Sequence, residues 1–83
     1  MAEEMIGKVT HYYTRLGVAA VELTGELKLG DTIRILGHTT EFEQVVRSMQ
    51  LEHENIAIGQ AGQVIGLEVA EKVRRSDKVF KLT

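Results

Sequence analysis

The sequence predicts an all-β fold, and three patterns carry that prediction. Apolar and polar residues alternate between Leu27 and Ile35, a period of two that is typical of a strand with one buried face. Residues 5–13 are rich in Tyr, Val, Ile and Thr, which favour strands. The chain has eight glycines and no proline, so we expect glycine to make the turns.

The 83 residues suit a single domain, residues 1–83, with one hydrophobic core. The 43% of residues that are apolar can build that core, and the 27% that are charged can cover it. The absence of cysteine excludes disulfides and thiolate metal sites, and it fits a cytoplasmic location. No apolar run approaches the roughly 20 residues of a membrane span, so we expect no membrane partner.

The first two strands are predicted at residues 5–13 and 18–23. In the second segment, residues 18–21 are all apolar, so both faces of the strand would be apolar up to Glu22. This is expected of a strand that is covered on both sides. Leu16 and Gly17 form the expected turn between them, so the two strands should pair as a hairpin.

Residues 24–37 are predicted to form a strand, a turn at Gly30-Asp31 and a second strand. Side chains of one parity are expected on the buried face, namely Leu27, Leu29, Ile33 and Ile35. Further along, residues 64–69 and 78–82 are predicted strands.

Residues 42–49 carry conflicting signals. Phe42, Val45, Val46 and Met49 recur at the spacing of an amphipathic helix. Against a helix, Val45 and Val46 are β-branched, and a bulge at Val46 would restore the alternation of a strand. On local rules the segment stays open between strand and helix, with helix slightly ahead.

Four blocks of the sequence, in this order and spacing, resemble the second, β-barrel domain of translation GTPases such as elongation factor Tu and its archaeal and eukaryotic counterparts. The blocks are GELKLGDTIRI at 25–35, VRSMQLEHE at 46–54, AGQVIGL at 61–67 and VRRSDKV at 73–79. Ser76 departs from the glycine that usually precedes the aspartate. The chain is also similar to small stand-alone barrels of this type and to the barrel appended to some collagenase-like peptidases.

The resemblance implies a small, six-stranded closed β-barrel, in which residues 46–51 form a strand. Closure removes sheet edges that would otherwise pair with other chains. The resemblance also implies a non-catalytic module that binds RNA, either tRNA or rRNA, or a ribonucleoprotein, because the barrel of the family helps to hold the acceptor end of aminoacyl-tRNA. The alternative hypothesis is a protein adaptor or an accessory subunit of a peptidase-like enzyme.

Two groups of residues are candidates for RNA binding. The densest basic cluster contains Lys72, Arg74, Arg75 and Lys78, whose charges suit phosphate. The second group mixes cations with aromatic rings, a combination that stacks bases and holds phosphate: Lys8, His11, Tyr12, Tyr13 and Arg15. The alternative is a solvated charged face, and a Tyr pair of which one ring lies in the core.

The sequence offers no catalytic or metal-binding set and predicts no cofactor. The phosphate-binding loop that a GTPase needs, Gly-x-x-x-x-Gly-Lys-Ser/Thr, does not occur, so we expect no nucleotide cofactor. The run Glu52-His53-Glu54 places neighbouring side chains on opposite faces of an extended chain, so neither carboxylate is expected to orient the imidazole. We therefore expect no enzyme activity.

Overall fold

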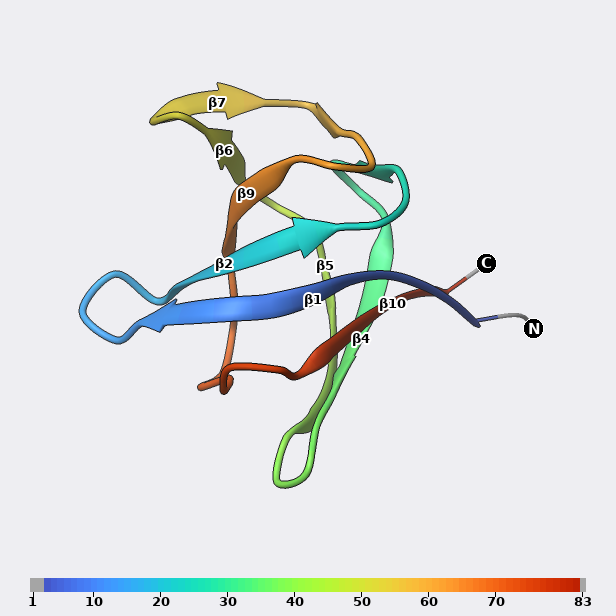
Figure 1. Ribbon diagram of the computed structural model, residues 1–83, viewed down its shortest axis with the longest axis vertical. Helices are drawn as coiled ribbons and strands as arrows, with labels where there is room; N and C mark the ends of the chain where they lie inside the picture. The colour runs from blue at the N-terminus through green and yellow to red at the C-terminus, as the bar shows by residue number, and fades with distance from the viewer. Residues whose placement is uncertain (1–2, 83) are drawn as a thin grey trace.

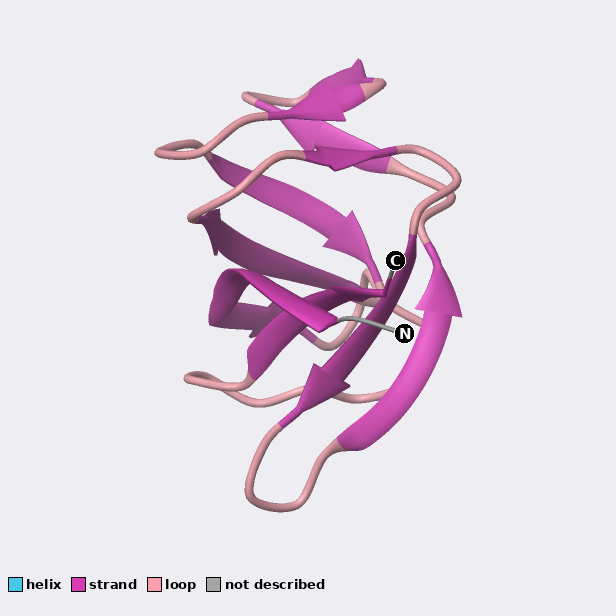
Figure 2. Ribbon diagram, turned by 90° about the vertical axis from the view of Figure 1, so that its right-hand side faces the viewer, coloured by secondary structure: helices cyan, strands magenta, loops and turns pink. Residues whose placement is uncertain are grey.

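The computed structural model describes residues 3–82, and every regular element in that range is a strand (Figure 2). The all-β prediction is confirmed, although the strands are more numerous than expected, and four of them have only two or three residues. They are β1 Glu3–Tyr13, β2 Val18–Leu23, β3 Leu27–Lys28, β4 Thr32–Leu36, β5 Glu41–Val45, β6 Met49–Leu51, β7 Glu54–Ile56, β8 Ile58–Gly59, β9 Val64–Glu68 and β10 Lys78–Leu82.

Eight of these strands form one antiparallel sheet in the order β5-β4-β10-β1-β2-β9-β6-β7, while β3 pairs with β8. β1, the longest strand, pairs with β10 on one side and with β2 on the other. The β1–β2 hairpin has the predicted turn, in which the Gly17 N–H donates to the Tyr13 carbonyl at 3.0 Å. Figure 1 shows this hairpin and the β4–β5 hairpin extending from the body of the molecule.

The hydrogen-bonded order of strands ends at β5 and at β7, so the predicted closed six-stranded barrel is not established. A gap without strand pairing therefore separates the β5 end of the sheet from the β6–β7 end, but one segment of the chain connects these two ends. β5 pairs with β4, β6 pairs with β9, and only residues 46–48 separate β5 from β6 in the chain. The Gln44 side chain spans the same gap, because its amide nitrogen donates to the Glu68 carbonyl and its oxygen accepts the Ala70 N–H.

The segment with conflicting local signals is extended. Val46 and Met49 are each only 1% exposed, although they are three positions apart. Residues 46–48 between β5 and β6 are irregular and interrupt the strict alternation of side chains between the two faces. Both Val46 and Met49 can therefore point into the core. Two buried positions at this spacing imitate the pattern of a helix, which explains why the local rules favoured the wrong element.

One hydrophobic core lies on the inner side of the main sheet. Leu27, Ile33 and Ile35 are buried as predicted, but Leu29 is 44% exposed. Leu29 already belongs to a turn, so the strand parity ends before it. The buried apolar side chains are Ile6, Val9, Ala19, Val21, Leu23, Leu27, Ile33, Ile35, Val46, Met49, Ile65, Leu67, Val69, Val73 and Val79.

Three turns repeat the same hydrogen-bond pattern, at Lys28–Asp31, residues 60–63 and residues 74–77. In each, the first N–H donates to the side-chain oxygen of the fourth residue, at 2.9, 2.9 and 2.8 Å. In all three turns, the backbone N–H of the fourth residue donates a hydrogen bond to the carbonyl of the first residue, at 3.1 Å. All three turns have a positive φ at the third residue, as in a type II turn, and this is the conformation that glycine adopts most easily.

Glycine holds that third position in two of the turns, Gly30 with φ 91° and Gly62 with φ 93°. Ser76 holds it in the third turn with φ 78°, so the serine keeps the geometry that glycine would have. This third turn is fastened to the middle of the sheet, because the Ser76 N–H donates to the Val9 carbonyl and the Val9 N–H to the Asp77 carbonyl.

Candidate functional site

The outer side of β1, β2, β9 and β6 carries the candidate site, and we call it the groove face. Strand register aligns its side chains in three rows, because residues paired across antiparallel strands lie on the same side of the sheet. The middle row runs His11, Ala20, Gly66, Gln50 and Asn55; the rows beside it are Tyr13, Val18 and Glu68, and Lys8, Glu22 and Val64.

A β-bulge in β1 creates this arrangement. The register shifts between Val9, which opposes Val21, and His11, which opposes Ala20, so Thr10 is the extra residue. Val9 is fully buried and His11 is exposed. Because of this bulge, the side chains of His11 and Tyr13 point outward and that of Tyr12 points inward.

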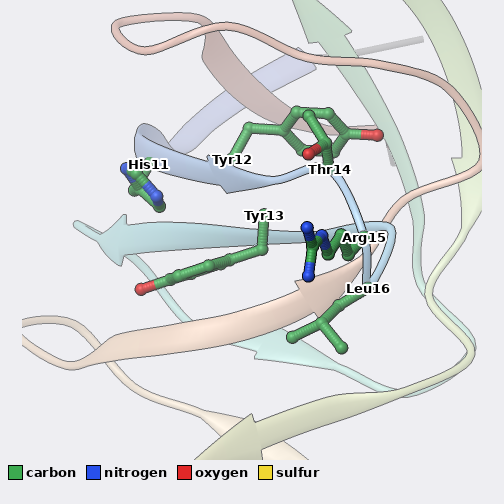
Figure 3. A pocket seen from close by; sticks show the side chains of 6 residues that line it. All are labelled: His11, Tyr12, Tyr13, Thr14, Arg15 and Leu16. Carbon is green, nitrogen blue, oxygen red and sulfur yellow. The ribbon is translucent and has the colours of Figure 1, made fainter.

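The two tyrosines project to opposite sides of the hairpin, as Figure 3 shows. Tyr12 packs against the core, whereas Tyr13 is 46% exposed. The ring of Tyr13 meets His11 edge to face, with ring centroids 4.4 Å apart and an interplanar angle of 66°. This contact is of the kind that aromatic pairs prefer, and it holds Tyr13 at the border of the groove face.

A hollow of about 340 Å³ opens in the middle of the groove face. Ala20 and Gly66 form its floor, since they are the two smallest side chains in the middle row. A Cβ built on Gly66 would meet Val18 Cγ1 at 3.4 Å, an ordinary van der Waals contact, so a small side chain could be added here without a clash. The remaining lining side chains are Tyr13, Leu16, Val18, Gln50, Glu52, His53, Val64 and Ile65.

The tight turn between β6 and β7 forms one wall of the hollow. Leu51 pairs with Glu54, which leaves only Glu52 and His53 in the turn. Both have a positive φ, 52° and 69°, as a type I′ hairpin requires. Asn and Gly are the residues that suit these positions, so this wall holds two residues in a conformation that is unfavourable for them.

Three exposed carboxylates surround the hollow. Glu22 follows Ala20 by two positions on β2, and Glu68 follows Gly66 by two positions on β9, so they lie at diagonally opposite corners of the floor. Glu52 is on the wall. Among the described residues, none of the three forms an ion pair within 4.0 Å. Lys8 opposes Glu22 across β1 and β2, whereas no cation opposes Glu68 in the strand register.

The predicted basic residues do not assemble with the tyrosines. Lys72, Arg74 and Arg75 are exposed on the connection between β9 and β10, and Lys78 begins β10. Lys8 lies between the two regions, since it opposes Lys78 of β10 on one side and Glu22 of the groove face on the other. Arg15 alone stays with His11, Tyr12 and Tyr13, at the tip of the hairpin (Figure 3).

Residues 72–78, which we call the basic segment, are fixed through their backbone and through two buried side chains. Val73 is 1% exposed and Asp77 is 4% exposed, and Asp77 Oδ2 accepts the Arg74 N–H at 2.8 Å. The cationic side chains of the segment make no hydrogen bond or ion pair with the described part of the chain.

Arg34 of β4 is the centre of an ion-pair network away from the groove face. Its guanidinium donates to Glu3 of β1 at 3.0 Å and also to Glu41 of β5. The hydrogen bond to Glu3, followed by the one to Glu41, raises the pKa of Arg34 above its ordinary value. Arg34 therefore stays charged and links strands β1, β4 and β5.

Sequence reasoning missed most of the groove face. Of the candidates, Lys8, His11 and Tyr13 lie on this face, but its floor at Ala20 and Gly66 and its wall at the β6–β7 turn were not expected. The one signal available was a pair of small residues, Ala20 and Gly66, in strands otherwise rich in larger side chains. Residues 3–82 hold no cluster of three His, Asp or Glu side chains that would suit a metal ion.

Comparison with known proteins gives relatives that are named as peptidases. The chain is 42% identical over 78 residues to an uncharacterized protease of Methanocaldococcus jannaschii. The aligned region covers 93% of this chain and 19% of the protease. It is equally similar to a collagenase of Porphyromonas gingivalis, covering 22% of that protein. This chain thus spans about a fifth of the length of these relatives. A scan against models of known protein families finds no match.

Among solved structures, the C-terminal domain of a U32 peptidase from Geobacillus thermoleovorans superposes with a TM-score of 0.90. The alignment covers 96% of this chain and 93% of that domain, at 20% sequence identity. The selenomethionine variant of the same domain gives a TM-score of 0.87. This chain has the fold of a U32-peptidase C-terminal domain.

These relatives correct the functional prediction. The translation-factor-like, RNA-binding module is wrong, since the similar proteins are named as a protease, collagenases and a U32 peptidase. The predicted similarity to a domain of collagenase-like peptidases is confirmed, and the findings favour the alternative of a protein adaptor or accessory subunit of a peptidase-like enzyme. The resemblance to elongation factor Tu is not shown. The cation clusters misled the prediction because dense charge in a sequence does not distinguish a binding site from a solvated surface.

No helix in residues 3–82 is long and apolar enough to cross a membrane. The cytoplasmic location stays a prediction.

Proposed function

We propose that this chain is a non-catalytic accessory domain that docks onto the catalytic part of a U32-type peptidase. The observation that carries the proposal is the difference in length between this chain and its relatives. The similarity extends over almost the whole of this chain but over about a fifth of each relative. A segment of this size with its own core has the properties of a domain, which in those proteins is joined to a much larger remainder.

The chemistry of the groove face supports binding over catalysis. The described lining of the hollow contains no serine, threonine or cysteine, the side chains that act as nucleophiles in peptide-bond hydrolysis. Its polar groups are Gln50, Glu52, His53 and the Tyr13 hydroxyl, around an apolar floor. An apolar surface with few polar groups is typical of a site that binds another molecule without transforming it.

The experiment is a binding titration with the Methanocaldococcus jannaschii protease from which the region matching this chain has been removed. We expect the purified chain to bind the truncated protease and to release no peptides from gelatin by itself. Circular dichroism of the truncated protease checks that it is folded, and the intact protease serves as the control whose docking position is already occupied. Failure of the folded, truncated protease to bind, or hydrolysis of gelatin by the chain alone, contradicts the proposal.

We also infer that residues 41–51 close the main sheet into a six-stranded barrel. The pairing of β5 with β4 and of β6 with β9 supports closure, as do the two hydrogen bonds of the Gln44 side chain. Closure would give the docking face a rigid support. In Gln44→Ala we expect faster hydrogen exchange at the Ala70 amide, with little change at the Val21 amide in the middle of the sheet. Unchanged exchange at Ala70 argues against closure through Gln44.

A further inference from the structure

We infer that the groove face binds a segment of the partner peptidase in which an apolar side chain is followed or preceded by Lys or Arg. The inference rests on the proposed function and adds the surface and the chemistry of its partner. Four features of the face carry it: exposed apolar side chains, an open floor, unpaired carboxylates and a strained wall.

Exposed apolar side chains concentrate on this face. Tyr13 is 46% exposed, Leu16 71% and Val64 51%, and all three line the same hollow. The other large apolar side chains that are exposed in the described residues lie outside this hollow: Met5, Leu29, Val45 and Ile58. Apolar side chains gathered around a concave site with a polar rim mark an interaction surface.

The floor admits a side chain of a partner. Ala20 and Gly66 leave the backbone of β2 and β9 accessible, and the volume of about 340 Å³ suits one or two apolar side chains. Tyr13 stands beside the floor, held by its contact with His11. An aromatic ring fixed beside a small apolar hollow is the arrangement found at the energetic centre of protein interfaces.

The charge around the floor selects the partner. Within residues 3–82, Glu52 and Glu68 are exposed and form no ion pair, and no cation opposes Glu68 in the strand register. A Lys or Arg next to the inserted apolar side chain would pair with one of them, while an acidic segment or a nucleic acid would be repelled. The chemistry that fits is therefore a basic and apolar polypeptide segment.

The strained wall is an independent observation. Glu52 and His53 keep positive φ angles in a turn for which Asn and Gly are better suited. Backbone strain of this kind persists mostly where function needs the side chain. Both strained residues line the hollow, and Glu52 is the one whose carboxylate could pair with a cation, so the turn points to Glu52 as a contact of a basic partner.

The experiment titrates the isotopically labelled chain with a synthetic peptide of alternating leucine and lysine and follows the backbone amides by NMR. We expect shifts at Ala20, Val64 and Gly66, and weaker binding as salt rises. Two matched peptides replace lysine with glutamate or leucine with serine, and we expect both to bind at least about tenfold more weakly.

Two substitutions in the chain complete the test. Gly66→Val fills the hollow with a side chain that suits a strand, and we expect it to lower the affinity for the leucine–lysine peptide at least about tenfold. Ala57→Val adds similar bulk at an exposed position outside the groove face and should leave the affinity unchanged. Glu52→Lys with Glu68→Lys should reverse the preference toward the glutamate peptide, whereas Glu4→Lys with Glu71→Lys, an equal change in net charge elsewhere, should not.

The outcomes separate this inference from the proposed function. Absence of peptide binding, equal binding of the glutamate peptide, or full affinity of a folded Gly66→Val variant overturns the inference. If the truncated protease binds wild type and Gly66→Val equally well, the domain docks through another surface, and the accessory function remains. If the truncated protease does not bind although the leucine–lysine peptide does, the proposed function fails and the groove face remains a site for basic and apolar segments.

Discussion

The groove face and the basic segment differ in how the molecule holds their side chains. On the groove face, strand register and the bulge at Thr10 bring together residues from β1, β2, β9 and β6 around an open floor. In the basic segment, the structure fixes the backbone and Asp77, while the cationic side chains extend into solvent without partners in the described chain. The first region has the geometry of a site, and the second has the geometry of a structural turn with a charged exterior.

The difference shows why a face built from several strands is harder to recognise in a sequence than a cluster of charge. A basic cluster is visible in the sequence because its members are neighbours in the chain. The groove face is not visible there, because Tyr13, Ala20, Gln50 and Gly66 become neighbours only through pairing between strands that are far apart in sequence. Substitutions in the two regions should therefore have different effects on stability and on binding.

Asp77→Ala tests whether the basic segment is held by its turn. Asp77 is buried and accepts the Arg74 N–H, so its removal leaves a donor without a partner and a gap beside Gly37. We expect a loss of about 2 kcal/mol in the free energy of unfolding, measured by urea denaturation. Asp31→Ala, in the equivalent but less buried turn, is the matched control and should cost about 1 kcal/mol. Equal losses would show that burial of Asp77 adds nothing.

Tyr13→Ala tests the groove face at its aromatic wall. The ring is half exposed in the free chain, so we expect the free energy of unfolding to fall by no more than about 1 kcal/mol. Affinity for the leucine–lysine peptide should fall by about 2 kcal/mol, roughly thirtyfold, because the ring would be buried on docking. His38→Ala, an exposed ring at the tip of the β4–β5 connection, should change neither quantity. Retained affinity in Tyr13→Ala would remove the tyrosine from the interface.

Glu52→Asn combined with His53→Gly tests whether strain in the β6–β7 turn serves docking. Asn-Gly suits both positive φ angles, so we expect the free energy of unfolding to rise by about 1 kcal/mol. The same variant lacks the Glu52 carboxylate and should bind the leucine–lysine peptide more weakly. A gain in both stability and affinity would contradict a role for the strained carboxylate in binding.

Ser76→Gly tests the third of the repeated turns. Glycine adopts the φ of 78° at this position with less strain than serine does, so we expect a gain of about 0.5 kcal/mol in the free energy of unfolding. Peptide affinity should not change, because the turn lies in the basic segment. The reverse substitution Gly30→Ser, in the first turn, should lower stability by a similar amount, and its failure to do so would mean that the turns are not equivalent.

Much of the fold was predictable because local sequence decides it. Alternation identified most strands, and Gly30-Asp31 and Leu16-Gly17 identified two turns. The segment 42–49 misled the local rules because an irregular connection at residues 46–48 buries Val46 and Met49 at helix-like spacing. The bulge at Thr10 had no sequence signal, since any residue with a compatible backbone can serve as the extra one.

The candidate site was less predictable than the fold. Tyr12 and Tyr13 were expected on opposite faces, and the structure has one in the core and one exposed. The partners of Tyr13 in the groove face depend on the register of four strands, which is set by the packing of the whole core. Ala20 and Gly66 are small residues in strands otherwise rich in larger side chains, but their neighbours were unknown without the sheet.

The most direct measurement compares two variants in one titration with the truncated Methanocaldococcus jannaschii protease, each checked for an unchanged circular-dichroism spectrum. The first is Gly66→Val in the groove face, and the second is Arg74→Ala with Arg75→Ala in the basic segment. Docking through the groove face predicts that Gly66→Val lowers the affinity at least about tenfold, while the double arginine variant binds as wild type does. Loss of affinity in the arginine variant, with wild-type affinity in Gly66→Val, would contradict it.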